Sequence, residues 1–272
     1  MSPTRAPSGV WPASPARQSS KHTRRRPIVP AHVTVSQFPD RPALVSAVAE
    51  QFADLLRGIQ ADPTGGIHND GVARVVLTGG TAGIELLSAM ATLKDIDFNR
   101  VEFFFGDERN VSATHPDSNE GQARAALLSK VNVSAERIHG WGLDGGDMSD
   151  QVREYASTVA QHAPRGFDLH LLGMGGEGHI NSLFPHTDAV REDTRTTLAV
   201  TDSPKPPAER ATLTLPAVRS AERVWLLVAG AEKAEAASHV AHGAPADEWP
   251  AAGAQGRAET VLFVSDDAAS ML

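Results

Sequence analysis

Short apolar runs alternate with segments of helical periodicity along most of this chain of 272 residues. The predicted strands cover residues 72–77, 101–105, 167–172, 198–201, 224–228 and 261–264, and the predicted helices cover residues 44–59, 84–93, 122–130, 151–161 and 232–240. Short strands that alternate with helices are typical of βαβ units, which build a mostly parallel sheet. We therefore predict an α/β fold with a mostly parallel, doubly wound (Rossmann-like) sheet and helices on both faces.

The first thirty residues have a different composition from the rest of the chain. They are rich in Pro, Ser, Ala and Arg, and they contain six basic residues and no acidic one. We expect a basic, disordered extension over residues 1–30 and a single α/β domain over residues 31–272. A transit peptide and a start codon assigned too early are the alternatives for this segment. The run Arg24–Arg26 is not followed by the apolar stretch that an export signal requires.

Composition excludes several classes of function. A net charge of −8 for the chain and +6 for its first thirty residues leaves −14 for the remainder, which disfavours nucleic-acid binding by the folded part. The absence of cysteine excludes disulfides, thiolate catalysis and cysteine-type zinc sites. No run approaches the roughly 18 apolar residues of a membrane helix, and the N-terminus lacks the apolar core of a secretory signal. We expect a cytoplasmic protein with no membrane or nucleic-acid partner.

A glycine-rich loop follows the predicted strand at residues 167–172. Residues 173–179 read Gly-Met-Gly-Gly-Glu-Gly-His and place Glu177 and His179 together. Glycine lets the backbone approach a ligand closely, and histidine transfers protons near neutral pH. The glycines also fit the G-x-G-x-x-G dinucleotide fingerprint, but that motif needs a long helix at its third glycine, and Pro185 follows too soon. We therefore interpret the loop as the edge of an active site.

Two other strand ends carry polar residues. Residues 78–81 (Thr-Gly-Gly-Thr) lead into a helix and form a candidate anion site, because free backbone N–H groups point out of a helix N-terminus. The alternative is a tight turn that needs glycine only for its geometry. Residues 107–109 (Asp-Glu-Arg) are either functional or merely solvated. Lys233 follows a further strand and is either an ordinary surface charge or a cation that reaches an anion held at residues 78–81. The carboxyl ends of parallel strands share one edge of the sheet, so we expect these loops to converge.

In this order, the segments resemble the 6-phosphogluconolactonase family, which is related to glucosamine-6-phosphate isomerase/deaminase. The resemblance extends from about Val33 to the C-terminus. It rests on TGGT at 78–81, GDER at 106–109, HPDSN at 115–119, LLGMGGEGHINSLFP at 171–185, RATLT at 210–214 and GAEKA at 230–234. It implies hydrolysis of 6-phospho-D-glucono-1,5-lactone, a small sugar phosphate, to 6-phospho-D-gluconate in the oxidative pentose phosphate pathway. It implies no metal and no other cofactor. We expect a monomer or weak homo-oligomer.

The resemblance also implies roles for individual residues. His179 is the expected general base, Glu177 orients His179 or water, and Asp107 either holds sugar hydroxyls or positions His179. The implied substrate-binding residues are Thr78, Gly79, Gly80, Thr81, Arg109, Gly175, Lys205, Arg210 and Lys233. Which of the four cations among them binds the phosphate stays open. Glu177 stands where the family usually has Asp. The longer side chain keeps the charge but changes its reach, so the role of Glu177 is the least firmly implied.

Two rival functions are considered. A hexosamine-phosphate isomerase or deaminase usually carries a Phe-Asn-Glu-Pro run after its histidine, which supplies a further acid. Residues 182–185 read Ser-Leu-Phe-Pro here, with no acid before Asp188, and this favours the lactonase. A non-catalytic sugar-phosphate sensor would not need a base, so the presence of His179 with two acids disfavours it.

Overall fold

The computed structural model describes Met1 and residues 33–272. The predicted basic extension and its boundary at residue 30 lie outside the described residues and stay predictions. The strands are β1 (Thr34–Phe38), β2 (Ala73–Leu77), β3 (Val101–Phe105), β4 (Asp107–Arg109), β5 (Ile138–His139), β6 (Leu169–Gly173), β7 (Thr197–Val200), β8 (Arg210–Leu213), β9 (Arg223–Val228) and β10 (Glu259–Ser265). The helices are α1 (Arg41–Ala61), α2 (Gly80–Met90), α3 (Asn119–Ala123), α4 (Ser149–His162), α5 (Asp188–Arg191), α6 (Leu215–Val218) and α7 (Ala234–Ala241).

Seven strands form the central sheet in the order β1-β10-β9-β6-β2-β3-β5, and every neighbouring pair is parallel. The register between β6 and β9 pairs Leu171 with Trp225. Strands β2 and β3 are buried along their whole length, which explains why their sequences are apolar runs interrupted only by Arg74 and Glu102. The predicted α/β fold with a mostly parallel sheet is confirmed.

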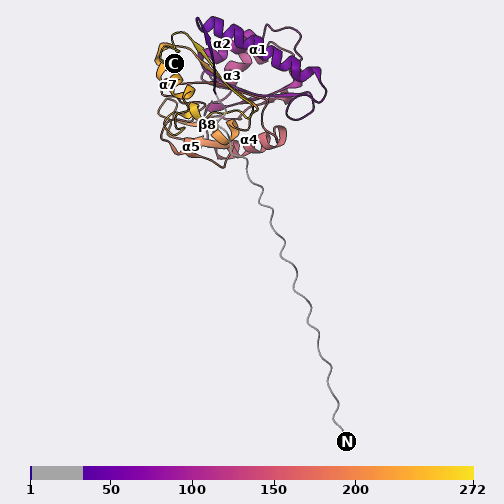
Figure 1. Cartoon of the computed structure of the whole chain (residues 1–272). Helices are drawn as coiled ribbons and strands as arrows, with labels where there is room; N and C mark the ends of the chain where they lie inside the picture. Colours follow the sequence, from indigo (N-terminus) through magenta and orange to yellow (C-terminus); the bar gives the residue numbers. More distant parts are fainter. Residues whose placement is uncertain (2–32) are drawn as a thin grey trace. The chain divides into compact units, whose positions relative to one another are not determined.

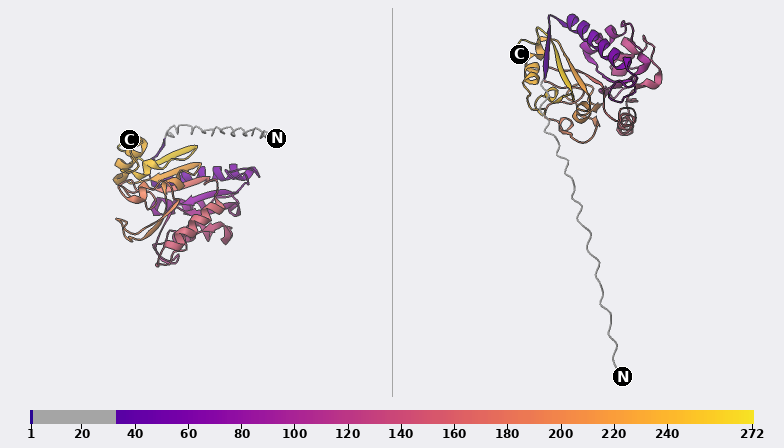
Figure 2. Two further views of the ribbon diagram at one scale, coloured as in Figure 1. Left: turned by 90° about the horizontal axis from the view of Figure 1, so that it is seen from below. Right: turned by 45° about the vertical axis from the view of Figure 1, so that its right-hand side comes forward.

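The strand order reverses its direction once, and this places helices on both faces of the sheet. From β1 the chain moves toward β5 through α1 and α2, and from β5 it returns through α4 toward β9 and β10. Because parallel crossovers are right-handed, the outgoing and returning helices cover opposite faces. Figure 1 shows α1 and α2 above the strands and α4 below them, and Figure 2 shows the same layers from two other directions. As a result β2 and β6 are neighbours, but the chain leaves β2 toward the β5 edge of the sheet and leaves β6 toward the β1 edge.

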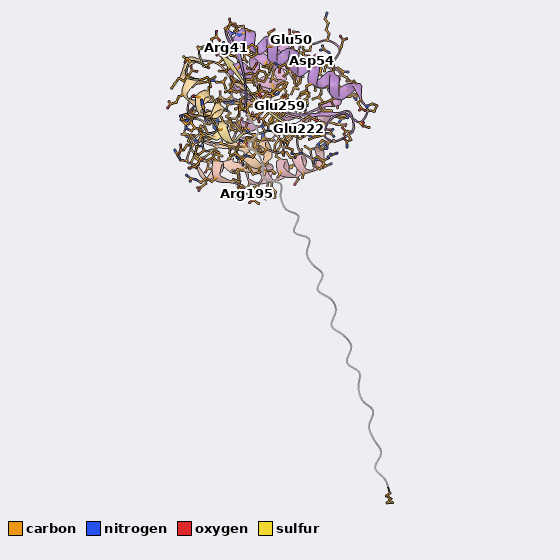
Figure 3. All side chains as sticks on the ribbon, in the orientation of Figure 1. Arg41, Glu50, Asp54, Arg195, Glu222 and Glu259 are labelled. Atoms are coloured by element: carbon orange, nitrogen blue, oxygen red, sulfur yellow. The ribbon has the colours of Figure 1, made fainter. Side chains whose placement is uncertain are left out.

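Helix α1 shows how the sequence dictates one layer. Asp40 caps its N-terminus by accepting a hydrogen bond of 2.8 Å from the Ala43 N–H. Its buried residues recur at helical spacing and pack into the main core, whereas the acidic side chains of Glu50 and Asp54 lie on the outer side of the helix (Figure 3). No helix among the described residues is long and apolar enough to cross a membrane.

A small antiparallel sheet, β4-β8-β7, is the main element that the sequence did not predict. Asp107 in β4 pairs with Thr212 in β8, so the polar segment after β3 is a strand and not a solvated loop. The predicted strand at residues 198–201 is β7, shifted by one residue. Strands β1 and β5 were also missed. The first has an exposed polar pattern and the second is only two residues long.

Candidate active site

The loops after β2, β3, β6 and β9 surround a cavity of about 420 Å³. It lies at the point where the connections of β2 and β6 diverge, which is where ligands bind in doubly wound sheets. The predicted site residues that line it are Thr78, Gly79, Gly80, Thr81, Asp107, Arg109, Gly175, His179, Lys205, Arg210 and Lys233. The one remaining predicted residue, Glu177, is not part of the lining but contacts His179 and Lys205.

The N-terminus of α2 faces this cavity. Gly79 is its N-cap and provides no side-chain hydrogen bond, so the first backbone N–H groups have no capping side chain. A Cβ atom at Gly79 would collide with the side-chain amide of Asn119, which explains why this position needs glycine. Thr78 Oγ1 accepts a hydrogen bond of 3.0 Å from the Gly173 N–H and so links the turn to the glycine loop. This arrangement is suited to binding an anion.

His179 is held at the cavity by its own loop and by an aromatic neighbour. The Gly175 N–H donates a hydrogen bond of 3.0 Å to the His179 carbonyl oxygen. The His179 ring stacks on Phe184 with 4.6 Å between ring centroids, and only 19% of its side chain is exposed. Nδ1 of His179 lies 3.1 Å from Oε1 of Glu177, within ion-pair distance but without a hydrogen bond. The ring is therefore fixed in place.

Burial holds the pKa of His179 below its ordinary value, and the charge of Lys205 acts in the same direction. The charges of Glu177 and Asp107 raise that pKa but do not outweigh burial. The imidazole is consequently neutral at neutral pH, as a general base must be.

Glu177 and Lys205 form an ion pair beside His179. Lys205 Nζ lies 2.7 Å from Oε1 and 3.0 Å from Oε2 of Glu177. Burial would raise the pKa of Glu177, but the hydrogen bond from Lys205 and the nearby His179 together lower it. The carboxylate therefore stays ionised and lies beside the neutral imidazole.

Asp107 belongs to a separate, fully hydrogen-bonded arrangement. Its Oδ2 accepts a hydrogen bond of 2.7 Å from Ser182 Oγ, and its Oδ1 accepts one of 3.0 Å from Asn119 Nδ2. Arg210 Nη1 lies 4.0 Å from Oδ2. No hydrogen bond between Asp107 and His179 is present among the described residues. Asp107 therefore acts on His179 only through its charge.

The neighbouring Glu108 and Arg109 have different partners. Glu108 is buried and accepts hydrogen bonds from the Ser118 hydroxyl and from the backbone N–H groups of Asn119 and Glu120. Burial raises the pKa of Glu108 despite these bonds. Arg109 donates a hydrogen bond to the side-chain oxygen of Asn119. Glu108 thus fixes the start of α3, whereas Arg109 reaches the cavity.

Two asparagines at the cavity were not assigned a role from the sequence. Asn119 bonds to both Asp107 and Arg109, and Asn181 lines the cavity beside His179. Both stand inside segments that carried the family resemblance, at HPDSN and at GHINSLFP. The motifs that contain them were therefore recognised. Asparagine is common in turns, however, so only the fold shows that these two side chains line the same cavity.

The four cationic side chains that line the cavity differ in their interaction partners. Lys205 pairs with Glu177, and Arg210 donates to the carbonyl oxygens of Lys205, Pro206 and Pro207. Lys233 forms no ion pair or hydrogen bond with another described residue through its ammonium group. It ends a short 3₁₀ turn (Ala231–Lys233) after β9, and burial lowers its pKa.

The family model that describes glucosamine-6-phosphate isomerases and 6-phosphogluconolactonase matches residues 39–263. The 6-phosphogluconolactonase of Mycobacterium tuberculosis is 42% identical over 249 residues, which are 88% of this chain and 98% of the relative. That of Streptomyces coelicolor is 42% identical over 216 residues, 74% of this chain and 83% of the relative.

Solved structures agree with the fold. The crystal structure of 6-phosphogluconolactonase from Thermotoga maritima has a TM-score of 0.75 at 25% identity, and the alignment covers 86% of this chain and all of that one. A monomeric glucosamine-6-phosphate deaminase also has a TM-score of 0.75, at 20% identity, over 88% of this chain and all of that one. The backbone alone therefore does not separate the two activities.

Proposed function

The chain belongs to the family of glucosamine-6-phosphate isomerases and 6-phosphogluconolactonases, and we propose that its cavity carries out the lactonase reaction with His179 as the general base. The substrate is 6-phospho-D-glucono-1,5-lactone and the product is 6-phospho-D-gluconate, so the enzyme is a carboxylic ester hydrolase. The observation that carries this mechanism is the partly buried imidazole of His179 at a cavity lined by four cations. A basic lining in a chain of net charge −8 favours an anionic substrate.

The proposed reaction begins with a water molecule between His179 and the lactone carbonyl. Nδ1 of His179 lies against Glu177, which leaves Nε2 to accept a proton from the water while the water oxygen bonds to the carbonyl carbon. The negative charge that develops on the carbonyl oxygen is stabilised by the cationic lining. The bond from the carbonyl carbon to the ring oxygen then breaks, and the ring oxygen takes the proton from His179. The acid product ionises, and the neutral imidazole is regenerated.

We propose that the phosphate binds between the N-terminus of α2 and Lys233. The backbone N–H groups at Gly79–Thr81 and the helix dipole attract an anion. Lys233 is the one lining cation whose ammonium group has no partner among the described residues, whereas Lys205 is paired with Glu177. Arg109 and Asp107 are then left near the sugar ring, where their hydrogen-bonding atoms can orient hydroxyl groups.

The rival deaminase activity has less support. Relatives that are 42% identical to this chain are lactonases, whereas the deaminase structure is 20% identical and supports only the fold. Ser182 stands where the deaminases usually carry the run with the additional acid, and its hydroxyl donates to Asp107.

The experiment that tests the function follows the disappearance of freshly generated 6-phosphogluconolactone with and without the protein. Spontaneous hydrolysis is subtracted, and glucosamine 6-phosphate is the parallel substrate. Rapid loss of the lactone with no release of ammonia is expected. Ammonia release from glucosamine 6-phosphate without lactone hydrolysis would instead identify a deaminase, and binding of both compounds without turnover would identify a sensor.

We propose that a monomer or weak homo-oligomer is the active form. We also propose a cytoplasmic location and no nucleic-acid partner, in keeping with the acidic charge of the chain beyond its first thirty residues.

Replacing Lys233 by Ala should raise KM about 10- to 100-fold and change kcat less, because a charge-assisted hydrogen bond to phosphate contributes roughly 1.5–3 kcal/mol. Steady-state kinetics with the phosphorylated lactone measure this effect. Glucono-1,5-lactone, which lacks the phosphate, should show no such change. Lys130→Ala, at an exposed position, is the matched control. An unchanged KM together with a lower kcat would contradict the phosphate role.

The pH dependence should respond in opposite directions to the two members of the ion pair beside His179. The acidic limb of kcat/KM reports the protonation of the base in the free enzyme. Glu177→Gln removes a charge that raises the pKa of His179, so this limb should move to lower pH. Lys205→Met removes a charge that lowers the same pKa, so the limb should move to higher pH. Profiles recorded between about pH 4 and 8 measure both, and a shift in the same direction for both variants would rule out His179 as the titrating base.

A further inference from the structure

A second group of chemically reactive side chains lies at the other end of β3 from the active site. Glu102 in β3, His139 in β5 and His162 in the last turn of α4 come together there. Glu102 precedes Asp107 by five positions, which corresponds to roughly 16 Å along a strand. None of the three residues lines the active-site cavity.

The three ligand-type atoms converge on a small volume. Oε2 of Glu102 lies 3.0 Å from Nε2 of His139 and 3.2 Å from Nδ1 of His162, and all three atoms are within 4.8 Å of one another. The two imidazole rings are 4.3 Å apart between centroids. Both ring nitrogens therefore lie close to the same carboxylate oxygen, and the His139 nitrogen is hydrogen-bonded to it.

The other oxygen of Glu102 is held by arginine. Arg137 Nη1 lies 2.7 Å from Oε1, and Arg74 Nη2 lies 4.0 Å from it. This contact orients the carboxylate and leaves Oε2 for the two histidines. Glu102 and His139 are buried, with 6% and 8% of their surface exposed, whereas the His162 side chain is 33% exposed. The cluster is therefore rigid on its inner side and open to solvent at His162.

We propose that Glu102, His139 and His162 bind a divalent transition-metal ion of the zinc class. Two imidazoles and a carboxylate are a ligand set that suits zinc, cobalt, nickel and ferrous ions, whereas magnesium and calcium prefer oxygen ligands. In a tetrahedral zinc site with bonds of about 2.0–2.1 Å, neighbouring ligand atoms are about 3.3–3.4 Å apart. The observed separations of 3.0 Å and 3.2 Å from Glu102 Oε2 need only a small expansion. Water on the exposed side is the fourth ligand.

The surroundings also define what such an ion does. Both histidines must be neutral to bind, so metal binding releases any proton that lies between a ring nitrogen and Oε2. The positive charges of Arg74 and Arg137 weaken the attraction for a cation, which makes binding reversible. The ion connects α4 to β3 and to the edge strand β5, so it stabilises the folded chain without taking part in lactone hydrolysis.

The test uses metal-free full-length protein and Zn²⁺ alone as the probe. Competition with a chromogenic chelator should show one ion bound per chain at this cluster, and Zn²⁺ at saturation should raise Tm by at least about 2 °C. His162→Ala should weaken binding by at least about 10-fold and abolish the rise in Tm, with lactone kinetics unchanged. His162→Gln provides a second variant should the alanine variant fold poorly.

Two matched variants separate this cluster from other histidines. His186 pairs with Asp247 at 3.3 Å, and Arg191 also contacts Asp247, so this surface group has an imidazole, a carboxylate and an arginine but lacks the second imidazole. His186→Ala should leave Zn²⁺ binding unchanged. Comparing Zn²⁺ binding by His179→Ala with that of the wild type shows whether an ion binds at the active site instead. The proposal is overturned if His162→Ala and His162→Gln both retain wild-type affinity, if the loss occurs in His179→Ala instead, or if Mg²⁺ produces the same rise in Tm.

Discussion

His179→Ala is expected to lower kcat for lactone hydrolysis by about 10²–10⁴-fold, which is the usual effect of removing a general base. Among the described residues that line the cavity, His179 is the only imidazole, and the remaining ionisable residues are Asp107, Glu232 and four cations. Asp107 cannot replace it readily because both of its carboxylate oxygens already accept hydrogen bonds. Initial rates after subtraction of spontaneous hydrolysis give the measurement.

The loss of rate should belong to the chemical step. KM should change much less than kcat, because the phosphate is bound at the N-terminus of α2 and not by His179. Exogenous imidazole should restore part of the rate by entering the space that the alanine leaves. His186→Ala, at an exposed histidine outside the cavity, is the control and should retain full activity. Turnover of His179→Ala within a few fold of the wild-type value would mean that another group activates the water.

The sequence predicted the central sheet well because its strands are buried on both faces. Residues 101–105 (Val-Glu-Phe-Phe-Phe) and 224–228 (Val-Trp-Leu-Leu-Val) have no solvated face, so their apolar runs stand out from the helices around them. Strand β4 gave no such signal. Asp107 to Arg109 are polar and become a strand only through pairing with Arg210–Thr212, about a hundred residues later. Local patterns do not encode such a long-range partner.

In the candidate site, too, local sequence features could be predicted and long-range contacts could not. The glycine loops could be recognised because a turn at the end of a buried strand needs residues without a Cβ atom, as at Gly79, where one would meet the Asn119 amide. The environment of each side chain could not be recognised. Asn119 bonds to Asp107 from 12 positions away and Ser182 from 75, and nothing in the sequence separates them from ordinary turn residues. The fold is what turns Asp107 from an exposed acid into a positioned one.

Gly175→Ala is expected to lower kcat about 10²-fold although it adds a single methyl group outside the reacting atoms. The Cβ atom would collide with the His179 ring at Nδ1 and Cε1 and would lie 2.6 Å from Oε2 of Glu177. Stacking on Phe184 and the bond from the Gly175 N–H to the His179 carbonyl limit how the ring can move away. A displacement of about 1 Å at a catalytic group costs on the order of 10²-fold in rate.

The matched control for this variant is Gly58→Ala in α1, where a Cβ atom meets nothing within 4 Å. It should keep full activity and gain roughly 0.5–1 kcal/mol in the free energy of unfolding, because alanine is favoured over glycine inside a helix. Thermal unfolding of Gly175→Ala should show that the loss of rate is not a loss of folded protein.

Combining Gly175→Ala with His179→Ala distinguishes a displaced base from a disturbed binding site. If Gly175 acts only by leaving room for the imidazole, the double variant should have the same kcat as His179→Ala alone, because no ring is left to displace. Steady-state kinetics of the wild type, both single variants and the double variant complete the cycle. Independent, multiplicative losses would show instead that the methyl group blocks the lactone or its attacking water, and that the glycine serves the substrate directly.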